Sequence, residues 1–390
     1  MVFSDRIAQL ASSATLAMAT RADELRAQGR DIISLSVGEP DFPTPDYIGD
    51  AAKKAIDEHF TRYTAQPGIT PLRAAVAGYF TREYGIAAEA ANVIITNGGK
   101  QGLYNAFIAL INPGDEVIIP APYWVSYPAM AELAGAKVVY AKASADVGFK
   151  LSVEALEAHR NPRTKILVLN SPSNPTGVCY TQAEVDAIAA WCLEKNIILL
   201  SDEIYDQLVY APAKMGSVAR WWEKYPEHFI VSGGASKTFA MTGWRVGYLL
   251  ADKELIKAMT RFQSHTTANI CSISQRAALA AYTGDLSVVA TMRTAFQRRR
   301  DLAMERISRW EGVACPKPDG AFYIFPDMHG LYGSRFTDSI SLCERILEET
   351  GVATVPGAAF GDDNCIRLSY AVSDEVLSAA LQRIEEYLYR

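Results

Sequence analysis

The sequence predicts an α/β protein in which a large domain holds a mostly parallel, doubly wound sheet and a smaller α+β domain is attached. Two observations support this fold class. Between about residue 90 and residue 250, short apolar runs rich in β-branched residues alternate with helical patterns. Strands that alternate with helices are typical of parallel sheets covered by helices on both faces. After about residue 285 the alternation stops, and a long basic helical pattern leads to isolated strand-like segments.

Seven apolar runs in the first region are expected to be strands. They cover residues 93–96, 116–120, 137–141, 165–170, 197–203, 228–233 and 245–251. Several are apolar almost throughout, as strands buried on both faces are. The clearest helix follows the fourth run, where Thr181 and Glu184 form a T-x-x-E capping box and an apolar stripe begins at Val185.

The C-terminal part is expected to form the smaller domain. Its pattern predicts a helix over about 291–307, strand-like segments at 321–325, 352–355 and 366–369, and a last helix whose apolar stripe ends at Leu388. The sequence shows no internal repeat and no flexible linker, so the two parts should pack closely. We therefore predict a large domain over residues 46–284. The small domain combines residues 285–390 with residues 1–45, which include an N-terminal arm.

Composition narrows the classes of function. The net charge of −6 and the pI near 5.5 argue against general binding to nucleic acid or to a membrane surface. Six scattered cysteines and five histidines lack metal-ligand spacing, so no metal site is predicted. The segment Leu10 to Ala19 is fairly apolar, but serines and a threonine interrupt it, so it is not interpreted as a secretory signal. We expect a cytoplasmic protein without a membrane span.

Ligands of open α/β sheets bind beyond the carboxyl ends of the strands, so the residues at the end of each run are the candidates for a binding site. After the first run, Asn97-Gly98-Gly99-Lys100-Gln101 opens a helix that should extend to about Ile111. Glycines and a helix N-terminus can cradle a phosphate group. The segment does not match the Walker pattern, and glycines at such turns also serve packing, so taken alone it leaves both readings open.

Other polar residues follow the later runs. Asn174 lies in a proline-rich loop after the fourth run, Asp202 lies at the end of the fifth run with Tyr205 just beyond it, Lys237 follows the sixth run, and Arg245 begins the seventh. Each of these residues also has a purely structural interpretation, such as a plain turn or a lysine exposed to solvent. Burying a carboxylate at a strand end, however, costs free energy unless it has a partner. Together they place a phosphate cradle, a carboxylate, an amide, a phenol, a lysine and an arginine at one sheet edge. Pyridoxal phosphate requires such a set.

These residues belong to motifs that run through almost the whole chain. The motifs are Gly38-Glu39-Pro40-Asp41-Phe42, Pro122-Tyr123-Trp124, Asn174-Pro175-Thr176-Gly177, Ser201-Asp202-Glu203-Ile204-Tyr205, Ser236-Lys237, Met241-Thr242-Gly243-Trp244-Arg245 and Arg367-Leu368-Ser369-Tyr370. In this order they resemble the class I aminotransferases of fold type I, and most closely the bacterial aspartate aminotransferase branch. The resemblance implies pyridoxal 5'-phosphate as the cofactor.

The resemblance also implies a role for each residue around the cofactor. Lys237 is expected to bind it as a Schiff base and to move the substrate proton, while Asp202 pairs with the ring nitrogen. Tyr205 and Asn174 would donate to the ring oxygen, and Trp124 would stack on the ring. The phosphate group would be bound by Gly99, Lys100, Gln101 and Arg245, with Tyr63 supplied by a neighbouring subunit of a homodimer.

The substrate site follows from the same resemblance. Arg367 is expected to bind the α-carboxylate beside Gly38, with Trp124 and Asn174 adjacent. Lys100 would reach the distal carboxylate of a dicarboxylic substrate, assisted by Ser13 and Thr15 of the arm.

Two departures from the family pattern are visible. Relatives often carry a phosphate-binding serine three residues before the lysine, where this chain has Gly234, and Ser236 is the available substitute. Members of the branch that use prephenate are expected to have a basic residue near the arm, where this chain has Ala11. Prephenate activity is therefore not predicted.

The predicted reaction exchanges an amino group between L-aspartate and 2-oxoglutarate by a ping-pong mechanism, giving oxaloacetate and glutamate. An alternative is an aromatic amino acid or alanine aminotransferase in which Tyr63, Trp124 and Phe360 form an apolar pocket and Lys100 only screens the phosphate. A β-lyase on the same fold is a further alternative. A non-catalytic domain of a transcription regulator is disfavoured, because no basic helix-turn-helix segment precedes Gly38.

Overall fold

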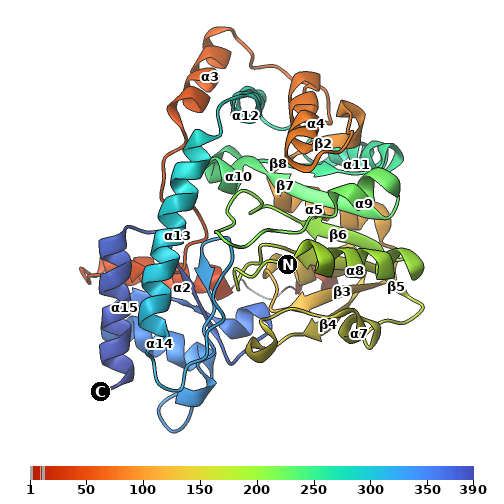
Figure 1. The fold of residues 1–390 in the computed structure, drawn as a ribbon. Helices are drawn as coiled ribbons and strands as arrows, with labels where there is room; N and C mark the ends of the chain where they lie inside the picture. Colours follow the sequence, from red (N-terminus) through yellow and green to blue (C-terminus); the bar gives the residue numbers. More distant parts are fainter. Residues whose placement is uncertain (1–2, 9, 11–13) are drawn as a thin grey trace.

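The computed structural model describes residues 3–8, 10 and 14–390, and its centre is a seven-stranded sheet (Figure 1). The strand order is β2-β8-β7-β6-β5-β3-β4. The strands are β2 (Val93–Asn97), β3 (Glu116–Ala121), β4 (Lys137–Lys142), β5 (Thr164–Asn170), β6 (Ile198–Asp202), β7 (Phe229–Gly234) and β8 (Val246–Leu250). All seven predicted strands are confirmed.

Strand β8 is the exception to the parallel arrangement. It pairs antiparallel with both of its neighbours, β2 and β7, whereas β3, β4, β5, β6 and β7 pair in parallel. The connection from β7 to β8, residues 235–245, is shorter than the dozen or more residues that a parallel crossover needs. The chain therefore turns back and runs β8 beside β7 in the opposite direction, a detail that the apolar pattern alone did not predict.

Helices cover both faces of the sheet, as the prediction of a doubly wound fold requires. One face packs on α5 (Gly99–Leu110), α6 (Ser126–Leu133) and α11 (Lys253–Thr266). The other packs on α4 (Thr70–Tyr84), α7 (Val153–Glu157), α8 (Gln182–Glu194), α9 (Ala219–Lys224) and α12 (Ser272–Thr283), and α3 (Asp46–Asp57) joins the same core by packing on α12. Neighbouring residues of a strand point to opposite faces, so Ile94 joins the first core and Ile95 the second. This alternation between two buried faces explains the nearly continuous apolar runs.

The capping box predicted for α8 is confirmed. The Thr181 hydroxyl accepts from the backbone N–H of Glu184, and the Glu184 carboxylate accepts in return from the N–H of Thr181. These reciprocal bonds satisfy two donors that the first turn of a helix leaves unpaired.

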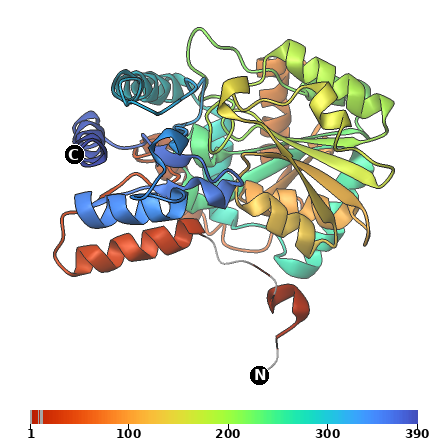
Figure 2. The ribbon, with the colours of Figure 1, turned by 90° about the horizontal axis from the view of Figure 1, so that it is seen from below.

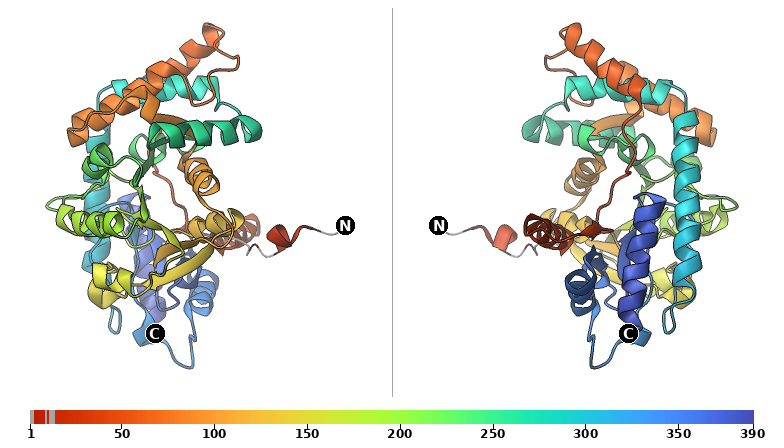
Figure 3. Two further views of the ribbon diagram at one scale, coloured as in Figure 1. Left: turned by 90° about the vertical axis from the view of Figure 1, so that its right-hand side faces the viewer. Right: turned by 90° about the vertical axis from the view of Figure 1, so that its left-hand side faces the viewer.

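The remaining elements build a second core beside the sheet. They are α2 (Ala14–Ala27), β1 (Ile33–Ser34), α13 (Ser287–Ile307), β9 (Tyr323–Ile324), α14 (Ser339–Thr350), β10 (Val352–Ala353), β11 (Val355–Pro356), β12 (Ile366–Ser369) and α15 (Asp374–Leu388). Strand β1 pairs with β10, and β12 lies between β11 and β9. Figure 3 shows α13 and α15 running side by side along this part of the molecule. The separate core supports the division at residues 45 and 284, which we propose as the domain boundaries.

The N-terminal segment joins this second part. Met18, Ala22 and Leu25 of α2 are buried in its core. The short helix α1 (Asp5–Ala8) is set off from the rest of the chain, and Phe3 and Ile7 are exposed (Figure 2). In the described part of the chain, the structure contains no helix with the length and apolar character that a membrane crossing demands.

Candidate active site

A cavity of about 440 Å³ lies where β5, β6 and β7 end and the second part of the chain packs against them. This volume is within the range of small-molecule sites. Ten of the predicted site residues line it: Gly38, Gly99, Lys100, Trp124, Asn174, Asp202, Tyr205, Lys237, Arg245 and Arg367. The structure therefore assembles residues that are separated by more than three hundred positions in the sequence.

Lys237 lies in the short helix α10 (Ala235–Thr238), directly after β7. Its Nζ donates to the carbonyl oxygen of Gly38 at 2.6 Å. Burial lowers the pKa of this amine to about 8; the Glu39 carboxylate opposes the shift, and the Arg245 and Arg367 guanidinium groups add to it. A substantial fraction of the amine is therefore neutral near pH 8, which is the form that acts as a nucleophile or a base.

Asp202 ends β6 and is only 5% exposed. Burial raises the pKa of its carboxyl group to about 6, and the hydroxyl of Tyr127, which donates to Oδ2 at 2.6 Å, opposes that shift. Tyr127, which also lines the cavity, was not among the predicted site residues. A buried carboxylate at a strand end needs a hydrogen-bond donor, but the sequence does not indicate that Tyr127 of α6 is the donor to Asp202.

Arg367 lies in β12 and is 3% exposed. Its guanidinium donates to Asn174 Oδ1 at 3.0 Å and to the carbonyl oxygen of Ser36 at 2.7 Å. It packs between the rings of Tyr323 and Phe360, with its central carbon 4.7 and 4.9 Å from their centroids. Its buried Nε has no hydrogen-bond partner among the described residues. Because a guanidinium keeps its charge in proteins, this group offers an oriented donor to an anion in the cavity.

Tyr205 is held by a second tyrosine that sequence analysis missed. The hydroxyl groups of Tyr205 and Tyr323 lie 3.0 Å apart, and both residues line the cavity. Asn170, at the end of β5, was also missed. Its Oδ1 accepts from the backbone N–H of Asn174 at 2.8 Å, and its Nδ2 donates to the Asp202 carbonyl oxygen at 2.9 Å. It therefore fixes the loop that aims Asn174.

The turn from β2 into α5 forms the cationic corner of the cavity. Gly98 adopts φ of 77°, a left-handed conformation that favours glycine, and any side chain there would collide with the Arg245 guanidinium. Arg245 itself has φ of 56° and donates to the Thr242 carbonyl oxygen at 2.9 Å. Strained backbone of this kind is concentrated at ligand sites. The N-terminus of α5 and Arg245 together provide N–H groups and positive charge for a phosphate.

Lys100 projects from the first turn of α5 over the ring of Trp124, with Nζ 5.0 Å from the ring centroid. Burial lowers the pKa of the Lys100 amine, and the nearby Arg245 charge adds to this. Within residues 3–8, 10 and 14–390 its amine pairs with no carboxylate. With Lys237, Arg245 and Arg367 it makes the cavity cationic, because Glu39 and Asp202 are the only carboxylates among the lining residues. The cavity suits an anionic ligand even though the chain as a whole is acidic.

The structure does not bring every predicted residue to the cavity. The Gln101 side chain accepts from the N–H of Asn97 and donates to Thr267, outside the lining. Tyr63 is 91% exposed and also lies outside it. Thr15 lies in α2, but its side chain is not described, and Ala11 and Ser13 fall outside the described residues. The predicted roles of these residues stay predictions.

The structure explains the glycine that stands three residues before Lys237. A side chain at Gly234 would begin 2.9 Å from the Val246 carbonyl oxygen, so the structure has no room there for a serine, whereas Ser236 lines the cavity. Of the three residues considered for an apolar pocket, Tyr63 and Phe360 do not line the cavity, and Trp124 does. The described residues contain no group of three or more His, Cys, Asp or Glu side chains arranged to hold a metal ion.

Comparison with known proteins adds independent information. Residues 30–384 match the family described as aminotransferase class I and II. The chain is 46% identical to an aspartate aminotransferase of Streptomyces avermitilis, over 99% of this chain and 96% of that protein. It is 47% identical to an aspartate/prephenate aminotransferase of Cereibacter sphaeroides, over 98% of both chains. The solved structure of the Thermus thermophilus aspartate aminotransferase with maleate superimposes with a TM-score of 0.94 at 41% identity, covering 99% of both chains.

Proposed function

The chain belongs to the class I and II aminotransferases, which are pyridoxal-phosphate-dependent enzymes, and from that premise we propose that it exchanges amino groups between L-aspartate and 2-oxoglutarate. The products would be oxaloacetate and glutamate, formed in a ping-pong sequence. One observation carries the substrate assignment. The cavity has Arg367 at one side and Lys100, a cation without a carboxylate partner among the described residues, at another. Two such cations match the two carboxylates of a dicarboxylic substrate.

The relatives support the same choice. Several are named aspartate aminotransferases, and the Thermus thermophilus structure contains maleate, which is itself a dicarboxylate. The apolar alternative is less favoured, because Phe360 packs beneath Arg367 instead of lining the cavity. Prephenate is left out of the proposal, since the chain has the uncharged Ala11 near the arm.

The residues of the cavity fit pyridoxal 5'-phosphate. The turn into α5 and Arg245 would hold the phosphate group. The Lys237 amine also lies in the cavity; it donates to the Gly38 carbonyl oxygen and forms no ion pair with a carboxylate among the described residues. Asp202 is a buried carboxylate with one hydroxyl donor, and it can pair with a protonated ring nitrogen. Trp124 presents its ring to the cavity, while Tyr205 and Asn174 supply polar groups that can bind the ring oxygen.

When bound, the cofactor supplies an electron-withdrawing ring that stabilises the charge left after a proton leaves the substrate Cα. The Asp202 carboxylate would pair with the protonated ring nitrogen. Lys237 would hold the cofactor through Nζ, and when Nζ is free it would accept the substrate Cα proton and later give it up. A pKa near 8 lets this amine act as a base close to neutral pH. Arg367 would hold the α-carboxylate and thereby orient the substrate Cα relative to Nζ.

Lys100→Ala tests the dicarboxylate assignment. We expect the KM for aspartate to rise about 10- to 100-fold, because a hydrogen-bonded ion pair with the distal carboxylate is lost. The KM for alanine, which has no distal carboxylate, should change by less than about threefold on the same reasoning. Steady-state kinetics with both donors measures this, with the exposed Lys253→Ala as the matched lysine control. Equal losses for the two donors would mean that Lys100 serves only the cofactor phosphate.

The reaction itself is tested by mixing the cofactor-loaded protein with L-aspartate alone. We expect the aldehyde-form absorbance of the cofactor to convert to the amine form with one oxaloacetate released per site, and 2-oxoglutarate to reverse the change. If only alanine or an aromatic amino acid drives the conversion, the aspartate assignment is wrong. Pyruvate and ammonia released continuously from an amino acid with a β-leaving group, such as cysteine, without any 2-oxo acid, would instead identify a β-lyase.

The proposal extends to assembly and location. Tyr63 is 91% exposed, lies away from the cavity of its own chain and carries a phenol suited to a phosphate oxygen. We therefore propose a homodimer with C2 symmetry in which Tyr63 completes the phosphate site of the partner subunit. We also propose that the protein works in the cytoplasm.

A further inference from the structure

The segment from Leu35 to Asp41 runs along the substrate side of the cavity. The Leu35 carbonyl oxygen accepts from the N–H of Ser369 at 2.8 Å, next to Arg367 in β12. The Ser36 carbonyl oxygen accepts from the Arg367 guanidinium, and that of Gly38 accepts from Lys237 Nζ. One short stretch of backbone therefore accepts hydrogen bonds from both Arg367, the proposed binder of the substrate carboxylate, and Lys237, the proposed catalytic amine.

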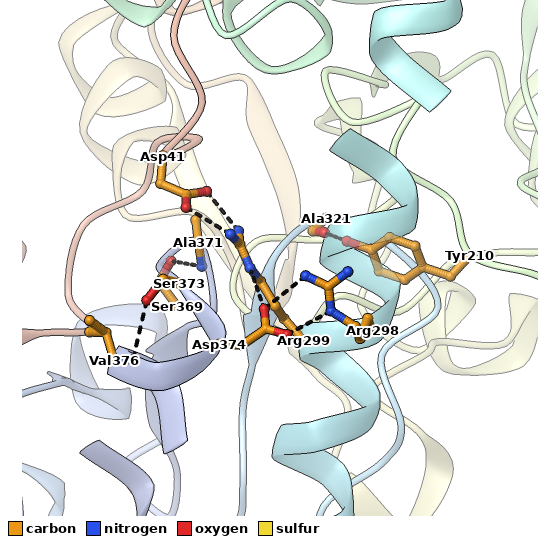
Figure 4. Close-up of polar contacts among 10 residues, drawn as sticks. All are labelled: Asp41, Tyr210, Arg298, Arg299, Ala321, Ser369, Ala371, Ser373, Asp374 and Val376. Atoms are coloured by element: carbon orange, nitrogen blue, oxygen red, sulfur yellow. Dashed lines mark hydrogen bonds and ion pairs between the residues drawn. The ribbon is translucent and has the colours of Figure 1, made fainter. Parts of the chain in front are cut away.

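Arg299 of α13 binds the far end of this segment. Its two terminal nitrogens donate to the two carboxylate oxygens of Asp41 at 2.7 and 2.9 Å, a bidentate pair (Figure 4). The Arg299 side chain is 7% exposed, and its guanidinium packs against the rings of Phe42 and Phe296, 5.3 and 5.5 Å from their centroids. A planar, buried and doubly bonded guanidinium fixes orientation as well as distance.

The same guanidinium also binds the chain that follows Arg367. Arg299 Nε donates to Asp374 Oδ1 at 3.3 Å, and Asp374 is the first residue of α15. The turn between β12 and α15 is held by local bonds (Figure 4). The Ser369 hydroxyl accepts from the N–H of Ala371 and the Ser373 hydroxyl from that of Val376, both at 3.3 Å. The position of Asp374 is therefore coupled to that of β12.

A neighbouring arginine provides a natural comparison. Arg298 also binds Asp374, at 2.6 and 3.0 Å, but it makes no contact with Asp41, and its side chain is 59% exposed. Arg298 thus joins α13 to α15 only. Arg299 joins α13, α15 and the segment that contains Gly38. A buried arginine shared by two carboxylates adds little net stability, because desolvation offsets the attraction. What distinguishes Arg299 is that it fixes the relative positions of these three segments.

We propose that Arg299, acting through Asp41 and Asp374, is a positioning residue that sets the distance between Gly38 and Arg367. The inference rests on the proposed function, since it assumes that a substrate carboxylate binds between these two residues. Arg299 does not touch the substrate. It holds the two chain segments so that the Arg367 guanidinium and the Gly38 carbonyl keep the spacing that the α-carboxylate and the Lys237 amine require.

Arg299→Gln is expected to raise the KM for aspartate between about 10- and 100-fold while kcat falls by less than about threefold, because misplacement weakens binding of the carboxylate first. Affinity for maleate, an unreactive dicarboxylate, should fall by a similar factor in calorimetric titration of the loaded protein. The affinity for pyridoxal 5'-phosphate should stay unchanged. Asp41→Asn, which keeps Arg299 paired with Asp374, should show the same pattern in KM and maleate affinity.

Two further variants separate positioning from simple stabilisation. Arg298→Gln removes contacts to Asp374 only and should leave the KM and the maleate affinity unchanged. Arg299→Lys keeps the charge without the bidentate fork, so it should recover part of the lost affinity. If Arg299→Gln and Arg298→Gln lower the thermal midpoint alike while the KM stays at the wild-type value, Arg299 is only structural and the inference is wrong. If Arg299→Gln does not fold, Asp41→Asn decides by the same criteria.

The wild-type protein separates this inference from the proposed function. A wild type that does not exchange amino groups with aspartate overturns the function, and the positioning role falls with it. An active wild type whose Asp41→Asn and Arg299→Gln variants keep normal KM values overturns the positioning role alone.

Discussion

Replacing Lys237 with alanine is expected to lower kcat/KM by about 10⁴-fold or more, the largest effect of any single change in the cavity. In the proposed mechanism, the variant loses both the nucleophilic amine and the base that would move the Cα proton. No other described amine takes its place, because Lys100 Nζ lies over the Trp124 ring at the cationic corner. The measurement is single-turnover kinetics of the cofactor-loaded variant with aspartate.

Lys237→Arg is the informative companion variant. Arginine keeps the positive charge, but it cannot lose its proton in a protein. An equally large loss would therefore assign the effect to the neutral amine, whose pKa of about 8 makes it available near neutrality. The alanine variant should be no less stable than the wild type, since removing a desolvated cation costs nothing electrostatically. A Lys237→Arg protein with more than a tenth of the wild-type rate would contradict the proposed mechanism.

Replacing Arg367 with alanine is expected to raise the KM for both the amino acid and the 2-oxo acid, on the order of 10²- to 10³-fold. Both substrates carry the α-carboxylate that this buried guanidinium is proposed to bind. Its loss also removes the donor to Asn174 and to the Ser36 carbonyl oxygen. Steady-state kinetics in both directions provides the measurement.

Two further variants show whether the rise in KM comes from lost binding of the carboxylate. Arg367→Lys keeps the charge but not the fork, and we expect a KM between those of the wild type and the alanine variant. Arg300→Gln removes a guanidinium that is equally buried but binds Asp301 and the Pro318 carbonyl oxygen outside the cavity. It should lower stability and leave the KM unchanged. A rise of the KM for only one of the two substrates would argue against a shared carboxylate site.

Much of the fold could be predicted because its signals are local. A strand buried on both faces is apolar throughout, and the capping box of α8 spans only four residues, so each can be recognised without knowing the rest of the chain. The grouping of the predicted site residues at the strand ends could also be predicted. In a parallel sheet, the residues after each strand meet at one edge, whatever fills the space between.

The remainder depends on contacts between distant segments. The apolar pattern of β8 is the same for a parallel or an antiparallel strand, so its direction was not visible. The hydrogen bonds that Tyr127 makes to Asp202, and Tyr205 to Tyr323, join residues that are far apart in the sequence. Nothing in the sequence around a tyrosine indicates which residue its hydroxyl group will bind. The pairing of Arg299 with Asp41 spans 258 positions, and in the sequence Arg299 is one of three consecutive arginines.

The reversal of the chain between β7 and β8 has a consequence for how the sequence can vary. Lys237 and Arg245 both lie on the connection 235–245, whose two ends are fixed by paired strands. The amine proposed to perform the chemistry and the guanidinium proposed to bind the phosphate are therefore separated by one short connection of fixed length. Surface loops of most enzymes gain or lose residues readily during evolution. The connection 235–245 should not tolerate such changes, because one inserted residue would move the Arg245 guanidinium relative to the Lys237 amine. We expect its length to be constant wherever this chemistry is retained.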